Sequence, residues 1–178
     1  MIESIIQKDR ELLIYLNNLG SEQWDGFWLI ITNQFSWTPL FVIVLFFLFK
    51  YYGWKKGLFT LFFIAALITF SDQLTNVIRG VFERLRPNND PEINGMLRTL
   101  IKPKSYSFVS GHATTSTVMT IFIIMLLKDY VKNIKFLVLF PLIFAYSRLY
   151  LGVHFPTDIL AGFINGTIIG FSAVKLYQ

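Results

Sequence analysis

From residue 37 onward the chain alternates long apolar runs with short charged loops. Five runs stand out, at residues 39–49, 57–70, 111–127, 136–146 and 159–174. A transmembrane helix needs about 20 mostly apolar residues, and flanking aromatic or weakly polar residues bring these runs toward that length. The pattern predicts an all-α fold, an integral membrane helix bundle with about five transmembrane helices.

The first 35 residues follow a different, amphipathic pattern. Within residues 2–19 apolar positions recur at helical spacing, but the charged residues 8–11 make the segment too polar to span a membrane. Residues 22–35 look like a second interfacial helix, and they add a sixth span if they cross the bilayer. We expect one domain over all 178 residues, with interfacial helices in 1–35 and a transmembrane catalytic bundle in 37–175.

The composition favours the lipid bilayer as the main partner. Hydrophobic residues make up 54% of the chain and charged residues 15%, and the 19 Phe and 4 Trp are typical of lipid contact. The net charge of +5 comes from basic residues between the apolar runs, which favours anionic lipid or phosphate over nucleic acid as a partner. Because the chain has no Cys, disulfides, thiolate catalysis and Cys-ligated metals are excluded.

The distribution of lysines predicts the orientation in the membrane. Lysines gather at residues 50–56, 128–135 and 175, and the positive-inside rule makes that side cytoplasmic. The loop 86–108 and the turn 148–155 then face the periplasm or the extracellular space. The opening residues do not resemble a cleavable signal peptide. We therefore expect a multi-pass protein of a bacterial inner (cytoplasmic) membrane, inserted through its own helices.

The second predicted span ends in a polar stripe. Its members recur every three or four residues, so on a helix they share one face. They are Asp72, Asn76, Arg79, Glu83 and Arg86. Charges near the end of a membrane helix are costly and tend to be functional, so the stripe should face the interior of the bundle. The alternative is that Arg79 and Arg86 extend to lipid head groups.

A second polar segment, Ser110, Gly111 and His112, opens the third predicted span. Serine is a favoured N-cap, and the free N–H groups at a helix start can bind an anion. Gly111 allows a close approach of the backbone. His112 would stand beside that anion site.

A third polar segment, residues 147–158, precedes the last span. Pro156 suits the first turn of a helix. His154 and Asp158 are four residues apart, so Asp158 can hold one imidazole nitrogen. That contact would fix the tautomer and make the other nitrogen more nucleophilic. The chain has only 2 His, and both lie in such segments on the same predicted side of the membrane.

Together these residues suit phosphoryl transfer. Arg79, Arg86 and Arg148 can bind the non-bridging oxygens of a phosphate. One histidine can attack phosphorus while the other protonates the leaving oxygen. Acidic residues are too few for a two-metal cluster, so we expect no metal and no cofactor.

The chain resembles the type 2 phosphatidic acid phosphatase family, whose relatives include bacterial undecaprenyl-diphosphate phosphatases. The family motif Ser-Arg-x5-His-x3-Asp is complete at residues 147–158. Pro-Ser-Gly-His appears at residues 109–112 with Val109 in place of Pro, and Lys-x6-Arg-Pro appears at residues 79–87 with Arg79 in place of Lys. The soluble haloperoxidases share these motifs, but the apolar spans argue against that branch.

The resemblance implies a role for each motif residue. His154 would be the nucleophile that forms a phosphohistidine, Asp158 its partner and His112 the general acid. The remaining motif residues would bind phosphate, namely Arg79, Arg86, Ser110, Gly111 and Arg148.

Several functional alternatives stay open. We expect hydrolysis of undecaprenyl diphosphate to undecaprenyl phosphate first, with lipid A or phosphatidylglycerol phosphate as alternative substrates. The loop 86–108, with Arg98, Lys102 and Lys104, is expected to set the choice. A lipid phosphotransferase would use the same residues, whereas a non-catalytic lipid carrier would need the arginines but not the histidines.

The last predicted span carries a stripe of small residues. Gly162, Gly166 and Gly170 recur every four residues. Such a stripe allows close helix packing inside the bundle, or else dimerisation, so the oligomeric state stays open.

Overall fold

The computed structural model describes residues 2–178, and every regular element in that range is helical. The main helices are α1 (Ile2–Asn18), α2 (Glu22–Thr32), α3 (Thr38–Phe82), α4 (Gly111–Leu127), α5 (Leu139–Tyr150) and α6 (Pro156–Tyr177). The short 3-10 helices are η1 (Gln34–Trp37), η2 (Pro87–Asn89), η3 (Asn94–Met96) and η4 (Ile134–Val138). The predicted all-α fold is therefore confirmed over the described residues.

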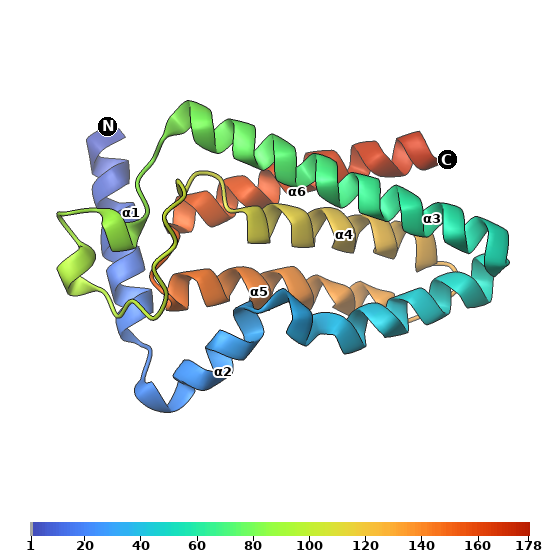
Figure 1. The fold of residues 1–178 in the computed structure, drawn as a ribbon, viewed down its shortest axis with the longest axis horizontal. Coiled ribbons are helices and arrows are strands. Elements are labelled where there is room, and N and C mark those ends of the chain that lie inside the picture. The colour runs from blue at the N-terminus through green and yellow to red at the C-terminus, as the bar shows by residue number, and fades with distance from the viewer. Residues whose placement is uncertain (1) are drawn as a thin grey trace.

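The first two predicted spans are the two arms of α3. This element has 45 residues and bends at Gly53, whose φ of 70° lies in the left-handed region that favours glycine. Residues 38–52 and 54–82 diverge from this bend toward the other end of the bundle (Figure 1). The bend thus joins two predicted spans without a separate loop.

α6 packs closely against α4 along its glycine stripe. A Cβ atom at Gly162 would lie 2.8 Å from the carbonyl oxygen of Ser110, and one at Gly166 would lie 2.6 Å from that of Thr114. A side chain at either position would push the two helices apart, and Gly170 is similarly close to α4. The interpretation of the stripe as packing within the bundle is therefore confirmed.

The outer surface of the bundle is apolar, as expected for contact with lipid. Large exposed side chains include Phe46, Phe62, Val81, Leu142, Leu160 and Ile168. Two helical segments, residues 34–89 and α6, are long and apolar enough to cross a membrane. α4 is apolar and has 17 residues. α2 has 11 residues and α5 has 12, each shorter than the length that a complete span requires.

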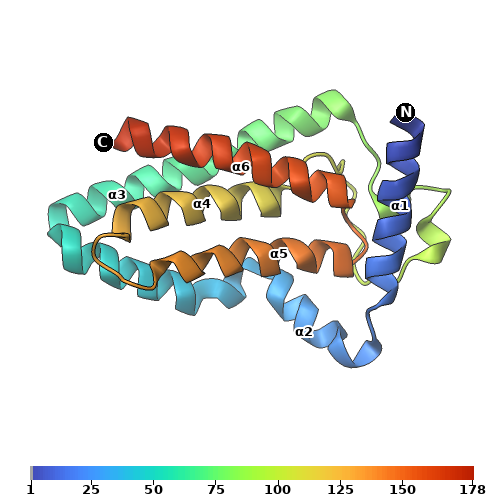
Figure 2. The ribbon, with the colours of Figure 1, turned by 180° about the vertical axis from the view of Figure 1, so that it is seen from behind.

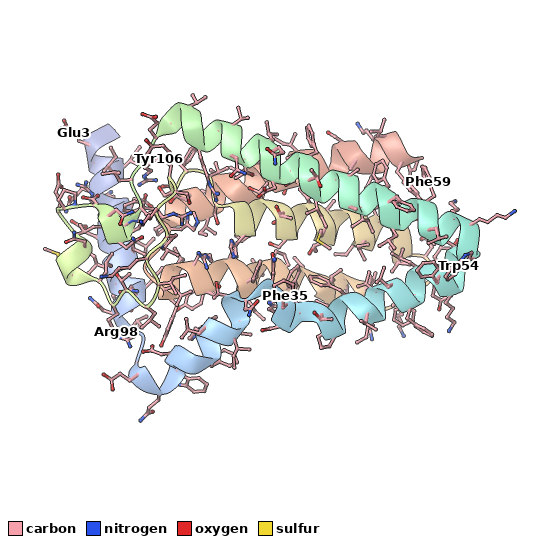
Figure 3. The ribbon with its side chains drawn as sticks, in the orientation of Figure 1. Glu3, Phe35, Trp54, Phe59, Arg98 and Tyr106 are labelled. Atoms are coloured by element: carbon pink, nitrogen blue, oxygen red, sulfur yellow. The ribbon has the colours of Figure 1, made fainter. Side chains whose placement is uncertain are left out.

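α1 lies crosswise over one end of the bundle (Figures 1 and 2). The C-termini of α3 and α5, the N-termini of α4 and α6 and the loop 83–110 also meet at this end. Figure 3 shows many nitrogen and oxygen atoms there, near Arg98 and Tyr106, whereas Trp54 and Phe59 mark the opposite end. The three polar segments noted in the sequence therefore converge beside α1.

The face that α1 turns toward the bundle is partly polar. Asp9, Leu13 and Asn17 are spaced by four residues and are all buried. Asn17 donates to the carbonyl oxygen of Tyr150 at 2.7 Å and accepts from the backbone N–H of Arg98 at 2.8 Å. The exposed side chains of this helix include Ile5, Ile6, Leu12 and Tyr15, as in a helix that lies in a membrane interface.

Candidate active site

His154 and Asp158 form the buried centre of the site. Their side chains are 1% and 0% exposed, and His154 Nδ1 lies 3.3 Å from Asp158 Oδ2. The same oxygen accepts the backbone N–H of Phe155 at 2.9 Å, which fixes the carboxylate at the start of α6. The expected contact between the two side chains is present, and Pro156 opens α6 as expected.

The second ring nitrogen of His154 faces an arginine. Arg86 Nη1 lies 3.0 Å from His154 Nε2. Because a guanidinium can only donate, Nε2 accepts this hydrogen bond and keeps its lone pair, while the proton sits on Nδ1 and is donated to Asp158. Burial, followed by the charges of Arg86, Arg148 and Arg79, lowers the pKa of His154 well below its ordinary value. The ring is therefore uncharged at pH 7.

Arg86 reaches the site from a loop, which corrects the predicted helical stripe. α3 ends at Phe82, and Glu83 adopts a left-handed conformation with φ of 47°. Glu83 and Arg86 therefore do not continue the helix face that carries Arg79. Arg86 is 4% exposed and donates to the carbonyl oxygen of Val153 at 2.9 Å, so it does not extend to lipid head groups. Burial lowers the pKa of Arg86 to about 10.

Arg79 is fixed near the end of α3. Its Nε donates to the carbonyl oxygen of Val109 at 3.0 Å, and its Nη1 donates to Asn76 Oδ1 at 3.4 Å. A Cβ atom at Gly111 would lie 3.1 Å from Arg79 Nη2. The close approach expected at Gly111 thus exists, and its partner is the guanidinium of Arg79.

Ser110 caps α4, as predicted. Its Oγ accepts the backbone N–H of Ala113 at 3.4 Å, and its own N–H donates to the carbonyl oxygen of Asp158 at 3.1 Å. The starts of α4 and α6 are therefore tied together. The hydroxyl serves the helix cap, and the first-turn N–H groups of Gly111 and His112 are the donors that suit an anion.

Arg148 brings an unused donor to the site from the last turn of α5. The residue is 6% exposed, and its Nη1 donates to Thr32 Oγ1 of α2 at 2.5 Å. Its Nε has no partner among the described residues. A buried N–H without an acceptor costs about 1–3 kcal/mol, so this donor is available to a bound anion.

His112 lines a cavity of about 700 Å³ between α4, α5 and the two arms of α3. Arg79 and Gly111 share this lining. The aromatic side chains of the cavity are Phe35, Trp37, Phe41, Phe140 and Phe144. The His112 and Phe144 rings are 4.7 Å apart, measured between their centroids. The site therefore joins cationic groups to an aromatic cavity that suits the apolar part of a lipid.

Two charged residues that the sequence did not single out also contact the site. Arg84 Nη1 lies 2.8 Å from Asp158 Oδ1, and Arg84 Nη2 lies 2.8 Å from Asp9 Oδ2. Arg84 stands within the arginine-rich segment 79–87, which was a possible signal. Asp9 had none, because its partners are far away in the sequence.

One basic residue of the long loop has a structural partner. Arg98 forms a salt bridge of 2.9 Å with Asp25 of α2, and Asp25 also accepts from the Tyr150 hydroxyl at 2.7 Å. Arg98 therefore fastens the loop to α2. Lys102 and Lys104 are exposed.

The described residues offer no evident metal centre. Within residues 2–178, no three His, Asp or Glu side chains gather as a metal site requires. Arg79, Arg86 and Arg148 supply the positive charge of the site.

Comparisons with known proteins point to one family. The model of the PAP2 superfamily matches residues 57–178. The lipid A 4'-phosphatase of Bacteroides thetaiotaomicron is 35% identical over 96% of this chain and 77% of its own length. That of Porphyromonas gingivalis is 30% identical over 99% and 75%. The undecaprenyl-diphosphatase of Sulfolobus acidocaldarius is 26% identical over 93% and 85%.

A solved structure shares the fold. It is the transmembrane PAP2 type phosphatidylglycerolphosphate phosphatase of Bacillus subtilis, with a TM-score of 0.77 and 23% identity. The match covers 97% of this chain and 86% of that one. The apolar outer surface of this chain agrees with the transmembrane nature of that structure. The chain therefore belongs to the PAP2 superfamily, the type 2 phosphatidic acid phosphatases, and is a membrane lipid phosphatase.

Proposed function

We propose that the chain removes phosphate from a lipid through a phosphohistidine on His154. The observation that carries this proposal is the pair of contacts on its ring. Nδ1 donates to Asp158 while Nε2 keeps a lone pair beside Arg86. A buried, uncharged imidazole with one oriented proton is what a nitrogen nucleophile requires.

The reaction then runs in two displacements. Nε2 of His154 attacks phosphorus, the bond from phosphorus to the lipid oxygen breaks, and His112 gives its proton to that oxygen. Water then attacks the phosphohistidine, His112 takes the proton from the water, and the P–N bond breaks. Asp158 stabilises the positive charge that develops on the ring of His154 at each displacement.

The phosphate would be held by groups that are already in place. Arg79, Arg86 and Arg148 can bind its non-bridging oxygens, and the unpaired Nε of Arg148 supports this assignment. The N–H groups of Gly111 and His112 at the start of α4 add donors of fixed geometry. These groups stabilise the spread charge of phosphoryl transfer without a divalent cation.

Lipid A is the substrate that we propose first. The two lipid A 4'-phosphatases are 35% and 30% identical to this chain, whereas the undecaprenyl-diphosphatase is 26% identical. These relatives support lipid A, which the sequence had given only as an alternative, better than undecaprenyl diphosphate, the substrate expected first. Undecaprenyl diphosphate and phosphatidylglycerol phosphate are the competing candidates.

We also propose five spans in a bacterial inner membrane, with the active site facing outward. Residues 38–52, residues 54–82, α4, α5 and α6 would be these spans. The supporting observation is that the lysines at residues 50–56, 128–135 and 175 lie at the bundle end away from the site.

The test is phosphate release by purified protein from lipid A, undecaprenyl diphosphate and phosphatidylglycerol phosphate, with EDTA present. We expect release of inorganic phosphate, fastest from lipid A. His154→Ala should abolish both turnover and the phosphoenzyme, and His112→Ala should slow turnover by about 10²- to 10⁴-fold. Ordinary turnover by His154→Ala would contradict the mechanism. Loss of activity in EDTA, restored by one metal, would contradict metal independence.

A further inference from the structure

We infer that Arg84 and Asp9 are positioning residues for the catalytic histidine, acting through Asp158. The inference rests on the proposed function, because it assigns a role in the same reaction. His154, Asp158, Arg84 and Asp9 form one unbroken chain of contacts from the nucleophile to α1. Neither Arg84 nor Asp9 belongs to the three motifs of the family.

Arg84 is held in one orientation by contacts on several sides. Its Nη1 donates to Asp158 Oδ1 and to Thr157 Oγ1, both at 2.8 Å, and its Nη2 donates to Asp9 Oδ2 at 2.8 Å. The guanidinium carbon also lies 3.9 Å from the centre of the Phe155 ring. Asp158 therefore receives Arg84 on one oxygen, while its other oxygen faces His154 and the N–H of Phe155. Its carboxylate plane, and with it the angle of the imidazole, is fixed by this contact.

Asp9 holds the second terminal nitrogen of Arg84, Nη2. It lies on α1, is 6% exposed, and accepts from the backbone N–H of Thr157 at 2.9 Å and from Thr157 Oγ1 at 2.5 Å. Asp9 thus bridges Arg84 and the first turn of α6. A buried carboxylate of this kind is tolerated because all its partners are donors.

The charges of Asp158, Arg84 and Asp9 also affect the reaction. Arg84 alone would neutralise Asp158 and leave no net negative charge for the imidazolium that develops on His154. Asp9 adds a second carboxylate, so the three charged groups sum to about one negative charge beside the ring. That balance opposes the positive charges of Arg79, Arg86 and Arg148, which would otherwise disfavour attack by the ring.

The main competing explanation is that Asp9 only fastens α1 to the bundle. The neighbouring residue Arg10 provides a matched control for this explanation. Arg10 also fastens α1, through Asp90 at 2.9 Å and through Glu92, but these partners do not contact Asp158. If loosening of α1 were enough to impair the enzyme, Arg10→Gln and Asp9→Asn would impair it equally.

The test measures kcat and KM for Asp9→Asn, Arg84→Gln, Arg84→Lys and Arg10→Gln, with the lipid of the panel that the wild type hydrolyses fastest. We expect kcat to fall about 10- to 100-fold in Asp9→Asn and in Arg84→Gln, with KM within about threefold of wild type. Arg84→Lys should recover part of the loss, because lysine keeps the charge. Arg10→Gln should keep a wild-type kcat even if its Tm falls.

A double variant tests whether Asp9 and Arg84 act through one series of contacts or independently. Because Asp9 acts through Arg84, Asp9→Asn should lower kcat little further when Arg84→Gln is already present. Wild-type kcat in Asp9→Asn, or equal losses in Asp9→Asn and Arg10→Gln, would overturn the inference. Absence of phosphate release by the wild type would instead overturn the proposed function.

Discussion

At the residue scale, the two nitrogens of His154 have partners of opposite kinds. Nδ1 faces an acceptor and Nε2 faces a donor. A phosphate that approaches Nε2 offers its oxygens to the same guanidinium of Arg86. Arg86 can therefore exchange its hydrogen bond with the ring for one with the substrate while Ser105 and Val153 hold its other N–H groups in place.

We predict that Asp158→Asn lowers turnover per folded molecule by about 10⁴-fold, as in the comparable triad of serine proteases. The amide can donate to Nδ1, which favours the tautomer without a nucleophilic lone pair at Nε2. KM should change little, because Arg79, Arg86 and Arg148 remain. Tm in detergent should be measured on the same preparation, since the salt bridge with Arg84 is lost as well. Near-normal turnover with only a lower Tm would reduce Asp158 to a structural residue.

The lowered pKa of His154 predicts how stability depends on pH. In the unfolded chain histidine titrates near pH 6.5, whereas the folded protein keeps His154 uncharged to well below that pH. The unfolded state therefore binds more protons once the pH falls below about 6.5, and stability is lost as the pH falls further. We expect Tm in detergent to fall between pH 7 and pH 5, and to fall less steeply in His154→Asn. An identical slope in both proteins would assign the effect to other groups.

At the element scale, the bundle depends on how closely α4 and α6 approach each other. We predict that Gly166→Ala destabilises the protein by about 1–3 kcal/mol, because the new Cβ would lie 2.6 Å from the carbonyl oxygen of Thr114. Gly80→Ala on α3 is the control, since its Cβ would meet nothing within 4 Å. Thermal unfolding in detergent measures both. Equal Tm values for the two variants would contradict the close packing.

How far the sequence predicts each element depends on the range of the interactions that define it. α4 begins and ends where its apolar run does, and its start is fixed locally by the Ser110 cap. The end of α3 could not be predicted, since nothing in the sequence marks the left-handed Glu83. The motif residues could be identified by type and spacing. The contact between His154 and Asp158 could be predicted because the two residues are only four positions apart. The pairing of Asp9 with Arg84 joins separate elements and depends on the tertiary fold alone.

At the scale of the whole molecule, charge is unequally distributed between the two ends of the bundle. One end carries the lysines of residues 50–56 and 128–135, and the other carries the arginines of the site. The lysines are exposed, whereas Arg86 and Arg148 are buried and Arg79 is half-buried. Only the lysines should count toward the orientation in the membrane.

This distribution predicts the sidedness of labelling. The chain has no native Cys, so Asn94→Cys and Lys132→Cys each introduce a single thiol. In intact cells an impermeant thiol reagent should label Asn94→Cys and leave Lys132→Cys unlabelled. Both should react after the membrane is permeabilised. The reverse result in intact cells would place the active site in the cytoplasm.

The bend at Gly53 bears on the depth of the active site in the membrane. A bend can leave backbone N–H and C=O groups unpaired, and the exposed Lys50, Lys55 and Lys56 flank this one, so we expect the bend to lie at a water-facing surface. From there to Arg79 the second arm of α3 advances by 26 residues, or about 39 Å at 1.5 Å per residue. The hydrocarbon layer is only about 30 Å thick, and a tilt of about 20° shortens the rise little. With the proposed spans, we therefore expect Arg79 to lie among the head groups of the opposite leaflet, where a lipid phosphate can be bound without moving its charge into hydrocarbon.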